Sequence, residues 1–270
     1  MKSSASRKKW TRDELFIVLN LYHKLAFGQF DQRNASVMAL AERLRRTPSS
    51  VAMKLSNLAS FDPALRLRGI KGLQGASKLD REMWEEFHGD LEGNIIASEE
   101  IIRDLFGAAG EDELEVSAKG GIRRIPRAKT PPEVTESIQT VKQRRGQAYF
   151  RECVLNNYEE QCAVTRIAVR DLLVASHILP WSSHPKERLN VQNGISLSRL
   201  HDAAFDRGYI AFDHDYCLLV SGELRDQFGS WEMFFANFER FEGQTLFIPP
   251  EALPPNPEFL AEHRETVFRG

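Results

Sequence analysis

Cysteine is scarce in this chain of 270 residues, and long apolar runs are missing. Cys153, Cys162 and Cys217 are an odd number without a C-x-x-C pair, which argues against a disulfide framework and a four-cysteine zinc knuckle. No apolar run approaches the roughly 18 residues of a membrane span. The first ten residues, MKSSASRKKW, have no apolar segment behind their basic residues. We therefore expect a reduced, cytoplasmic protein without a membrane segment.

Net charge is also small, at −2, but it is unevenly distributed. Residues 1–84 contain 16 Lys and Arg against 7 Asp and Glu, whereas residues 85–115 contain 11 acidic residues and one basic residue, Arg103. Such segregation predicts a cationic module that meets a polyanion, followed by an acidic hinge. An ordinary solvated helical surface is the alternative interpretation.

Three helices are predicted near the N-terminus. Apolar residues recur at helical spacing from Thr11 to about Ala26, where Thr11 and Glu14 fit a capping box. Further helices are expected over 36–44 and 49–59, joined by a short turn, and another over 79–87. Ser49 or Thr47 would cap the helix over 49–59, and Pro48 fits its first turn. Gly69 to Gly75 resembles a hairpin with glycine turns. The pattern predicts a mainly helical, winged helix-turn-helix-like domain over residues 1–106, with a protein-binding three-helix bundle as the alternative.

The third helix of this domain is expected to pack Val51, Leu55 and Leu58 inward and to face DNA with its polar side. Polar and basic side chains of this kind can reach bases or phosphates. The expected nucleic-acid contacts are Arg45, Arg46, Ser50, Lys54, Asn57, Lys71, Arg123 and Arg124.

Residues 107–140 are rich in Gly, Ala, Glu, Lys and Pro without sustained periodicity, and are predicted to be a linker. The second domain, 141–270, begins with a helix over 146–158 in which Phe150, Val154 and Leu155 share an apolar face. CAVT and LLVASHILPW suit two strands of a hairpin, and a loop, the short run ISL and a helix from about Ser198 follow. The whole chain is thus expected to be α+β.

Ser176 and His177 on a strand, Asn193 in a loop, and His201, Asp202 and Asp206 on a helix form a ββα-metal pattern. Phosphodiester hydrolysis needs an activated water and a cation that neutralises charge on the phosphoryl oxygens. A histidine can accept a proton near neutral pH. Asp202 and Asp206 lie one helical turn apart and can share a cation, and oxygen ligands favour Mg²⁺ or Mn²⁺.

Three sequence segments resemble the HNH endonucleases, especially restriction-type enzymes. In chain order they are CAVT, ASHILPW and NVQNGISLSRLHDAAFDRG. The resemblance is close over about 145–215. It implies that His177 is the general base that activates water and that Asn193 holds the loop and orients this histidine. His201 follows Asn193 by eight residues and Asp202 by nine, so the third motif position stays open between them.

The sequence departs from the family pattern at Ser176, since many HNH enzymes have Asp or His there as a metal ligand. The expected metal-site residues are Ser176, His201, Asp202 and Asp206. The expected cofactor is a divalent metal, preferably Mg²⁺, with Mn²⁺ or another transition metal as the alternative.

The favoured interpretation is a restriction-type, metal-dependent DNA endonuclease whose specificity can include base modification. Its substrate is double-stranded DNA, and one site cuts one strand, so a double-strand break requires a homodimer or two sequential nicks. Two alternatives stay open. One is a DNA-binding regulator with an inactive HNH-like half, and the other is an N-terminal protein-interaction domain that recruits the nuclease.

Overall fold

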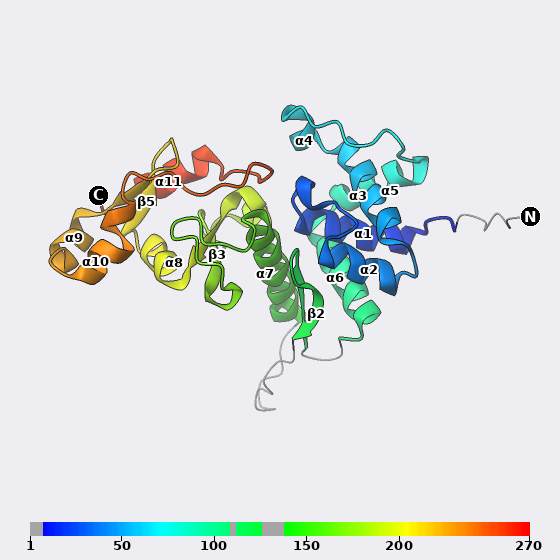
Figure 1. Ribbon diagram of the computed structural model, residues 1–270, viewed down its shortest axis with the longest axis horizontal. Helices are drawn as coiled ribbons and strands as arrows, with labels where there is room; N and C mark the ends of the chain where they lie inside the picture. Colours follow the sequence, from blue (N-terminus) through cyan, green and yellow to red (C-terminus); the bar gives the residue numbers. More distant parts are fainter. Residues whose placement is uncertain (1–7, 109–111, 126–137) are drawn as a thin grey trace, which may run out of the picture. The chain divides into compact units, whose positions relative to one another are not determined.

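A computed structural model describes residues 8–108, 112–125 and 138–270 (Figure 1). The chain divides into two compact units, Met1–Glu136 and Ser137–Gly270, and it is α+β as expected. None of the described helices is both long and apolar enough to cross a bilayer.

Unit 1 is mainly helical. Its helices are α1 (Arg12–Lys24), α2 (Ala35–Arg43), α3 (Pro48–Leu58), α4 (Pro63–Leu67), α5 (Lys78–Gly89) and α6 (Leu91–Phe106). The capping box of Thr11 and Glu14 is present at α1, and Thr47 caps α3 with Pro48 in its first turn. Local capping chemistry therefore fixed these starts, as predicted.

The core of unit 1 forms around α1, which packs against α3, α5 and α6. Val51, Leu55 and Leu58 of α3 are fully buried, which confirms the predicted inward face of this helix. Helices α2 and α3 are joined by a short turn in which Arg45 adopts a left-handed conformation, with φ of 53°.

Two predictions for unit 1 were wrong. No strand forms between Gly69 and Gly75, so the expected wing is absent from these described residues. The predicted linker instead contains a hairpin, with β1 (Glu113–Ser117) paired antiparallel to β2 (Gly121–Ile125). The hairpin packs on α2, and Ser36 Oγ donates a hydrogen bond to Ser117 O. The remainder of that segment, 126–137, lies outside the described residues.

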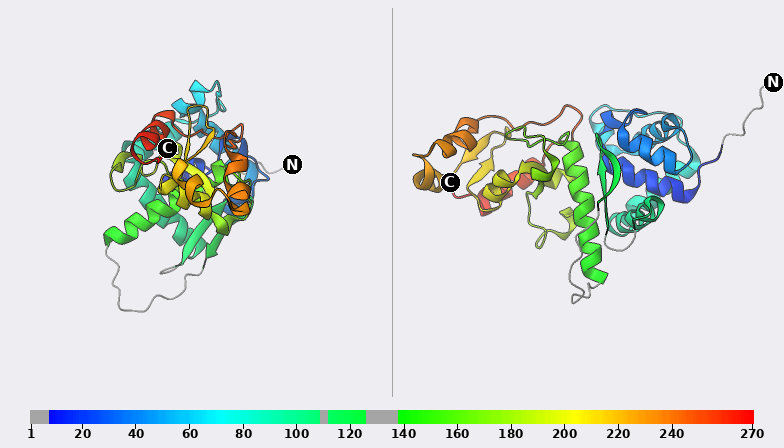
Figure 2. Two further views of the ribbon diagram at one scale, coloured as in Figure 1. Left: turned by 90° about the vertical axis from the view of Figure 1, so that its left-hand side faces the viewer. Right: turned by 60° about the horizontal axis from the view of Figure 1, so that its bottom comes forward.

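Unit 2 begins with α7 (Ile138–Asn157), where Phe150, Val154 and Leu155 are buried as predicted. Strand β3 (Leu173–His177) pairs antiparallel to β4 (Gly194–Ser198), and α8 (Arg199–Asp206) follows and packs on both strands. The remaining elements are β5 (Ile210–Phe212), β6 (Leu218–Val220), α9 (Gly222–Phe228), α10 (Glu232–Asn237) and α11 (Pro257–Thr266). Figures 1 and 2 show α11, in red, beside β5.

The expected partner of the LLVASH strand was wrong. Residues 162–165 form a turn rather than a strand, and β4 takes the place beside β3. The turn is still attached to this hairpin, because Ala163 N donates to Ser196 O at 2.7 Å and Ala163 O accepts from Phe247 N at 2.8 Å. The resulting order is strand, loop, strand, helix.

Candidate active site

The imidazole of His177 is held from three sides at the end of β3. Its ring stacks on Phe150 with centroids 3.8 Å apart and an interplanar angle of 14°, and it meets the edge of Trp181. Nε2 lies 3.1 Å from Arg188 O. Because a carbonyl only accepts, Nε2 carries the proton in the neutral ring, and Nδ1 has the lone pair that can accept a proton.

Burial lowers the pKa of His177, and the hydrogen bond to Arg188 O opposes this shift. Lowering favours the neutral imidazole near pH 7, which is the form that a general base requires. The environment thus sets both the tautomer and the protonation state.

Asn193 fastens the loop that carries this carbonyl. Its side chain is buried, and Oδ1 accepts from Leu179 N at 2.8 Å. Nδ2 donates to Leu179 O at 3.3 Å and to Glu187 O at 3.1 Å. Glu187 precedes Arg188, so Asn193 positions the backbone that orients His177.

Asp202 and Asp206 lie one turn apart on α8, and the pKa of each carboxyl group is raised. Burial raises the pKa of Asp202, although contact with the Ser176 hydroxyl and the charges of Arg199 and Arg207 oppose the shift. Partial burial and then repulsion from Asp202 raise the pKa of Asp206 to about 6, while Arg207 lowers it. Two carboxylates that disfavour each other's charge are suited to a shared cation.

Ser176 faces this pair from β3. It is buried, with an exposed fraction of 2%. Its hydroxyl makes no well-formed hydrogen bond within the described part of the chain, although it is close enough to lower the pKa of Asp202. Ser176, Asp202 and Asp206 are therefore brought together.

His177 is the next residue of the strand, and consecutive strand residues point to opposite faces. Its recorded partners, Phe150, Trp181 and Arg188 O, differ from those of Ser176. No interaction between His177 and either carboxylate is recorded among the described side chains. The structure thus shows two adjoining parts, a basic imidazole and a pair of carboxylates with a hydroxyl.

The residues present are better suited to a cation such as Mg²⁺, which needs few protein ligands, than to a metal enclosed entirely by protein ligands. Within residues 8–108, 112–125 and 138–270, no group of three or more His, Cys, Asp and Glu side chains is arranged to hold a metal. Mg²⁺ commonly uses one or two carboxylates and completes its shell with water and substrate phosphate. Asp202 and Asp206 meet that lower requirement.

The contacts of His201 differ from those of this group and give its predicted role as a metal ligand no support. It is 1% exposed, and Nε2 donates to Asn237 O at 2.8 Å. Nδ1 lies 2.8 Å from Ser198 Oγ, from which it accepts. Both ring nitrogens are used in joining the start of α8 to the end of α10, and a metal would have to displace one of these bonds.

Cys162 supports the same helix start from the turn at 162–165. Its side chain is fully buried, and Sγ accepts from Ser198 N at 3.2 Å and from Thr165 N at 3.4 Å. The buried thiol thus accepts backbone hydrogen bonds, a polar role that the position of Cys162 in the sequence does not reveal.

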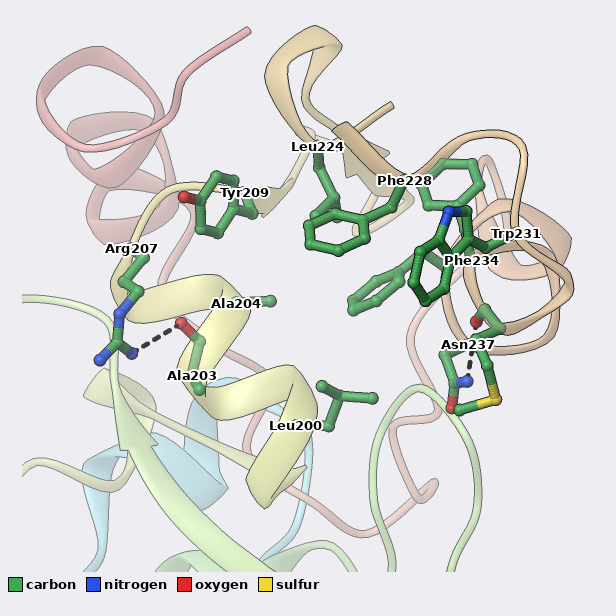
Figure 3. A pocket seen from close by; sticks show the side chains of 12 residues that line it. Leu200, Ala203, Ala204, Arg207, Tyr209, Leu224, Phe228, Trp231, Phe234 and Asn237 are labelled. Atoms are coloured by element: carbon green, nitrogen blue, oxygen red, sulfur yellow. Dashed lines mark hydrogen bonds between the residues drawn. The ribbon is translucent and has the colours of Figure 1, made fainter. Parts of the chain in front are cut away.

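An apolar pocket of about 460 Å³ lies beside the helix that carries the carboxylates (Figure 3). Leu200, Ala203 and Arg207 of α8 form one wall, and Phe228 and Trp231 form part of the opposite wall. Several large apolar side chains here are exposed: Leu200, Phe228, Trp231, Met233 and Phe235.

The expected nucleic-acid contacts in unit 1 fall into two sets. Arg45 and Lys71 are exposed and Ser50 is partly exposed. Arg123 and Arg124 are also exposed, but they pair with Glu115 and Asp112 across the hairpin.

Of the other three expected contacts, Lys54 and Asn57 are buried within unit 1, so their predicted outward orientation was wrong, and the side chain of Arg46 is only 5% exposed. Lys54 Nζ pairs with Asp80 at 2.7 Å, with side chains 9% and 0% exposed. Arg46 pairs with Glu14 at 2.6 Å and lies over the Trp10 ring. Asn57 is 6% exposed. Helical periodicity placed Lys54 and Asn57 opposite the apolar stripe, but α5 and the segment around Gly75 cover that side.

Comparison with known families identifies the segment that holds these parts. Residues 162–213 match the family model described as HNH endonuclease. This segment is an HNH endonuclease domain by family. The matched residues include His177, Asn193, Asp202 and Asp206. A search of curated proteins found no match to the chain.

Sequence reasoning missed several residues that shape the HNH site. Phe150 on α7 stacks on His177, and Arg188 supplies the carbonyl that fixes its tautomer. Phe150 was predicted only as a core residue, because a contact between α7 and β3 is not visible in a linear pattern. Arg207 follows Asp206 directly, and that adjacency was an available signal for a charge next to the carboxylates.

Proposed function

We propose that this chain is a metal-dependent DNA endonuclease of the HNH type. The observation that carries the proposal is that the HNH segment contains both a neutral Nε2-protonated His177 and, beginning at the adjacent residue of the same strand, a group of Ser176 with two carboxylates of raised pKa. His177 accepts a proton from water through Nδ1, and Asn193 holds the backbone that orients it. Asp202 and Asp206 hold the divalent ion, with Ser176 beside them. The ion, preferably Mg²⁺, would neutralise charge on the phosphate.

A plasmid assay tests this proposal. Supercoiled DNA is incubated with the wild type and with His177→Ala, in Mg²⁺, in Mn²⁺ and in EDTA. We expect nicking that needs metal and falls at least about 100-fold in His177→Ala, since positioned general bases contribute on that scale. His214→Ala is the matched control, because His214 is exposed and pairs only with its neighbour Asp215.

A second candidate is a DNA-binding protein whose HNH half is an inactive scaffold. It is favoured by Ser176 at the position before His177 and by the absence of a three-ligand group in the described chain. DNA binding without metal-dependent nicking by freshly folded wild type would favour this candidate over the nuclease.

Unit 1 is proposed to bind the duplex. Its support is the basic excess over residues 1–84 and the helix, turn, helix order of α2 and α3. Full-length His177→Ala should bind DNA with an affinity that falls steeply as salt rises. Salt-independent or absent binding would favour a protein-interaction role for this unit instead.

Restriction of foreign or modified DNA is proposed as the biological setting, by analogy with reader and nuclease architectures. Cleavage of matched unmodified, adenine-methylated and cytosine-modified DNAs, with mapping of the cut ends, tests this specificity directly.

Double-strand breaks are proposed to require two copies of the chain. The exposed apolar residues beside α8, especially Trp231 and Met233, support self-association. Sedimentation of the wild type and of Met233→Ser with and without DNA measures it. A monomer throughout that makes double-strand breaks at first order in protein would contradict this part.

A further inference from the structure

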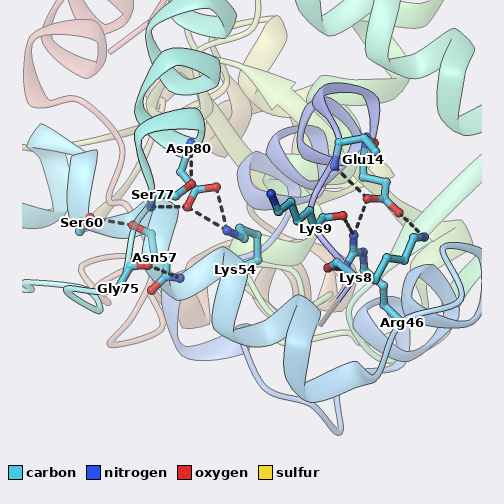
Figure 4. A network of polar contacts seen from close by, with 11 residues as sticks. Lys8, Lys9, Glu14, Arg46, Lys54, Asn57, Ser60, Gly75, Ser77 and Asp80 are labelled. Carbon is cyan, nitrogen blue, oxygen red and sulfur yellow. Dashed lines mark hydrogen bonds and ion pairs between the residues drawn. The ribbon is translucent and has the colours of Figure 1, made fainter. Parts of the chain in front are cut away.

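A basic cleft of about 950 Å³ opens in unit 1 at the start of α3. Several of its side chains, including Lys9, Arg46 and Lys54, belong to the network of polar contacts drawn in Figure 4. Lys8, Lys9 and Trp10 line it from the segment before α1, Arg45 from the turn between α2 and α3, and Asn57 from α3 itself. Its lining contains no acidic residue. The cleft lies far in sequence from the HNH segment, and the nuclease chemistry makes no use of it.

The cleft keeps a positive charge after its internal ion pairs are counted. Glu14 pairs with both Arg46 and Lys8, and Asp80 pairs with Lys54. Five basic side chains line the cleft, namely Lys8, Lys9, Arg45, Arg46 and Lys54, so these two carboxylates leave three positive charges. The first turn of α3 adds the positive end of a helix of eleven residues. The basic side chains and the helix start together suit the binding of a phosphate group.

A buried hydrogen-bond acceptor in the same cleft lacks a donor. Asn57 is buried, with an exposed fraction of 6%, and its Nδ2 donates to Gly75 O at 3.4 Å. Its Oδ1 has no hydrogen-bond partner among the described residues. A phosphate oxygen cannot satisfy this atom, because both are acceptors. The missing partner must carry an N–H or O–H group.

Trp10 supplies an aromatic surface between the charges and this amide. The ring is partly exposed, and the guanidinium of Arg46 lies 3.7 Å from its centroid. Nε of Arg46 is also buried without a partner in the described chain. Aromatic rings and guanidinium planes are the surfaces on which unpaired bases stack.

A ligand that satisfies all three features combines an anion, a flat ring and a hydrogen-bond donor. We propose that this cleft binds one unpaired nucleotide of a DNA strand. Its phosphate contacts Lys8, Lys9 and Arg45, its base lies against Trp10, and an exocyclic amino group donates to Asn57 Oδ1. The base is therefore adenine, cytosine or guanine, or a derivative that keeps an amino hydrogen. This inference rests on the proposed binding of DNA by unit 1.

Oligonucleotides that differ at one position test the proposal by fluorescence anisotropy. Full-length His177→Ala without metal is titrated with a fully paired duplex, with the same duplex bearing one unpaired cytosine, and with one bearing an abasic residue at that place. We expect the unpaired cytosine to bind about tenfold tighter than the paired duplex, on the scale of base stacking. The abasic duplex, which keeps the phosphate but lacks the base, should lose most of this gain.

Two variants separate the two halves of the cleft. Gly75→Ala keeps Asn57 but places a Cβ about 3.3 Å from its Oδ1, and should lower the ratio between the affinities for the unpaired-cytosine duplex and the abasic duplex. Lys9→Ser should weaken binding of all three DNAs, and Lys71→Ser, an exposed lysine outside the cleft lining, is its charge-matched control.

Equal affinity of the wild-type cleft for all three DNAs would overturn the nucleotide site. If Lys9→Ser still weakened paired-duplex binding, DNA binding by unit 1 would stand without it. Loss of binding to every DNA at low salt would instead overturn the proposed DNA-binding role together with the nucleotide site.

Discussion

The ring of Phe150 lies nearly parallel to the imidazole of His177, with centroids 3.8 Å apart. Gly194, which pairs with His177 across the hairpin, lies beside the edge of the Phe150 ring. A Cβ at 194 would come within 2.7 Å of Phe150 Cζ and would also clash with Val154. The glycine thus leaves the room in which Phe150 can support the catalytic histidine.

Gly194→Ala should therefore lower nicking activity by tenfold or more while the chain stays folded. The methyl group displaces Phe150 and, with it, the His177 ring, and small misplacements of catalytic groups have large effects on rate. Nicking and circular dichroism are measured together. Gly222→Ala is the control, because a Cβ there meets nothing within 4 Å. Wild-type activity in a folded Gly194→Ala would show that the stacking is not needed.

Asp206→Asn should abolish metal-dependent nicking and slightly raise the free energy of unfolding at pH 7. Partial burial and Asp202 raise the pKa of Asp206 to about 6. A raised carboxyl pKa costs the folded state stability as pH rises from the unfolded value through 6. Because more than a third of the Asp206 surface stays exposed to solvent, the gain in the free energy of unfolding should stay below about 1 kcal/mol.

Urea unfolding at pH 5 and pH 7 measures the difference in free energy of unfolding between Asp206→Asn and the wild type, which should be smaller at pH 5. Asp226→Asn, on α9, is the control, because this carboxylate lies about twenty residues from the pair in the sequence. A variant that nicks like the wild type would remove Asp206 from the metal site.

His201→Ala should destabilise unit 2 without weakening the affinity for metal. Its two ring bonds join Ser198 and Asn237, and removing the ring leaves buried partners unsatisfied at about 1–3 kcal/mol each. Thermal unfolding and Mn²⁺ titration are measured on the same sample below its unfolding temperature. Unchanged stability with a large loss of Mn²⁺ affinity would restore His201 as a ligand.

Glu14→Gln should destabilise the chain at neutral pH and have little effect in strong acid. Burial would raise the pKa of Glu14, but hydrogen bonds from Arg46, Lys8 and the Thr11 backbone hold it at about 2, below its ordinary 4.5. Stability from a lowered carboxyl pKa is complete above the unfolded value and disappears as pH falls from 4.5 through 2.

Thermal unfolding of wild type and Glu14→Gln from pH 2 to pH 7 measures this dependence. Glu82→Gln, an exposed glutamate with only a 3.5 Å contact to Lys78, is the control. A gap in stability that stayed constant over this range would contradict the role of the Glu14 charge.

The sequence predicted what local chemistry controls. Thr11 with Glu14 and Thr47 with Pro48 fixed the starts of α1 and α3, because capping bonds join residues only two or three positions apart. Periodicity also identified the inward residues of α3. Both signals depend on neighbours along the chain, so they survive without knowledge of the fold.

Tertiary pairing was not predictable in the same way. Lys54 occupies a polar helical position, yet Asp80 lies 26 residues away and neutralises it in the interior. His201 had the residue type and spacing of a ligand, yet Asn237 O accepts one of its protons from α10. CAVT has strand composition, but β4 completes the hairpin with β3. Each outcome was decided by a distant segment.

The reactivity of the Cys162 thiol can report on local opening at the start of α8. Its sulfur is sealed inside unit 2 and touches the backbone of Ser198, whereas Cys217 is partly accessible. An alkylating reagent should modify Cys217 readily and reach Cys162 only during moments when the turn at 162–165 separates from α8. The rate of the slow alkylation would then record how often the carboxylate-bearing helix detaches, without any label having to be introduced.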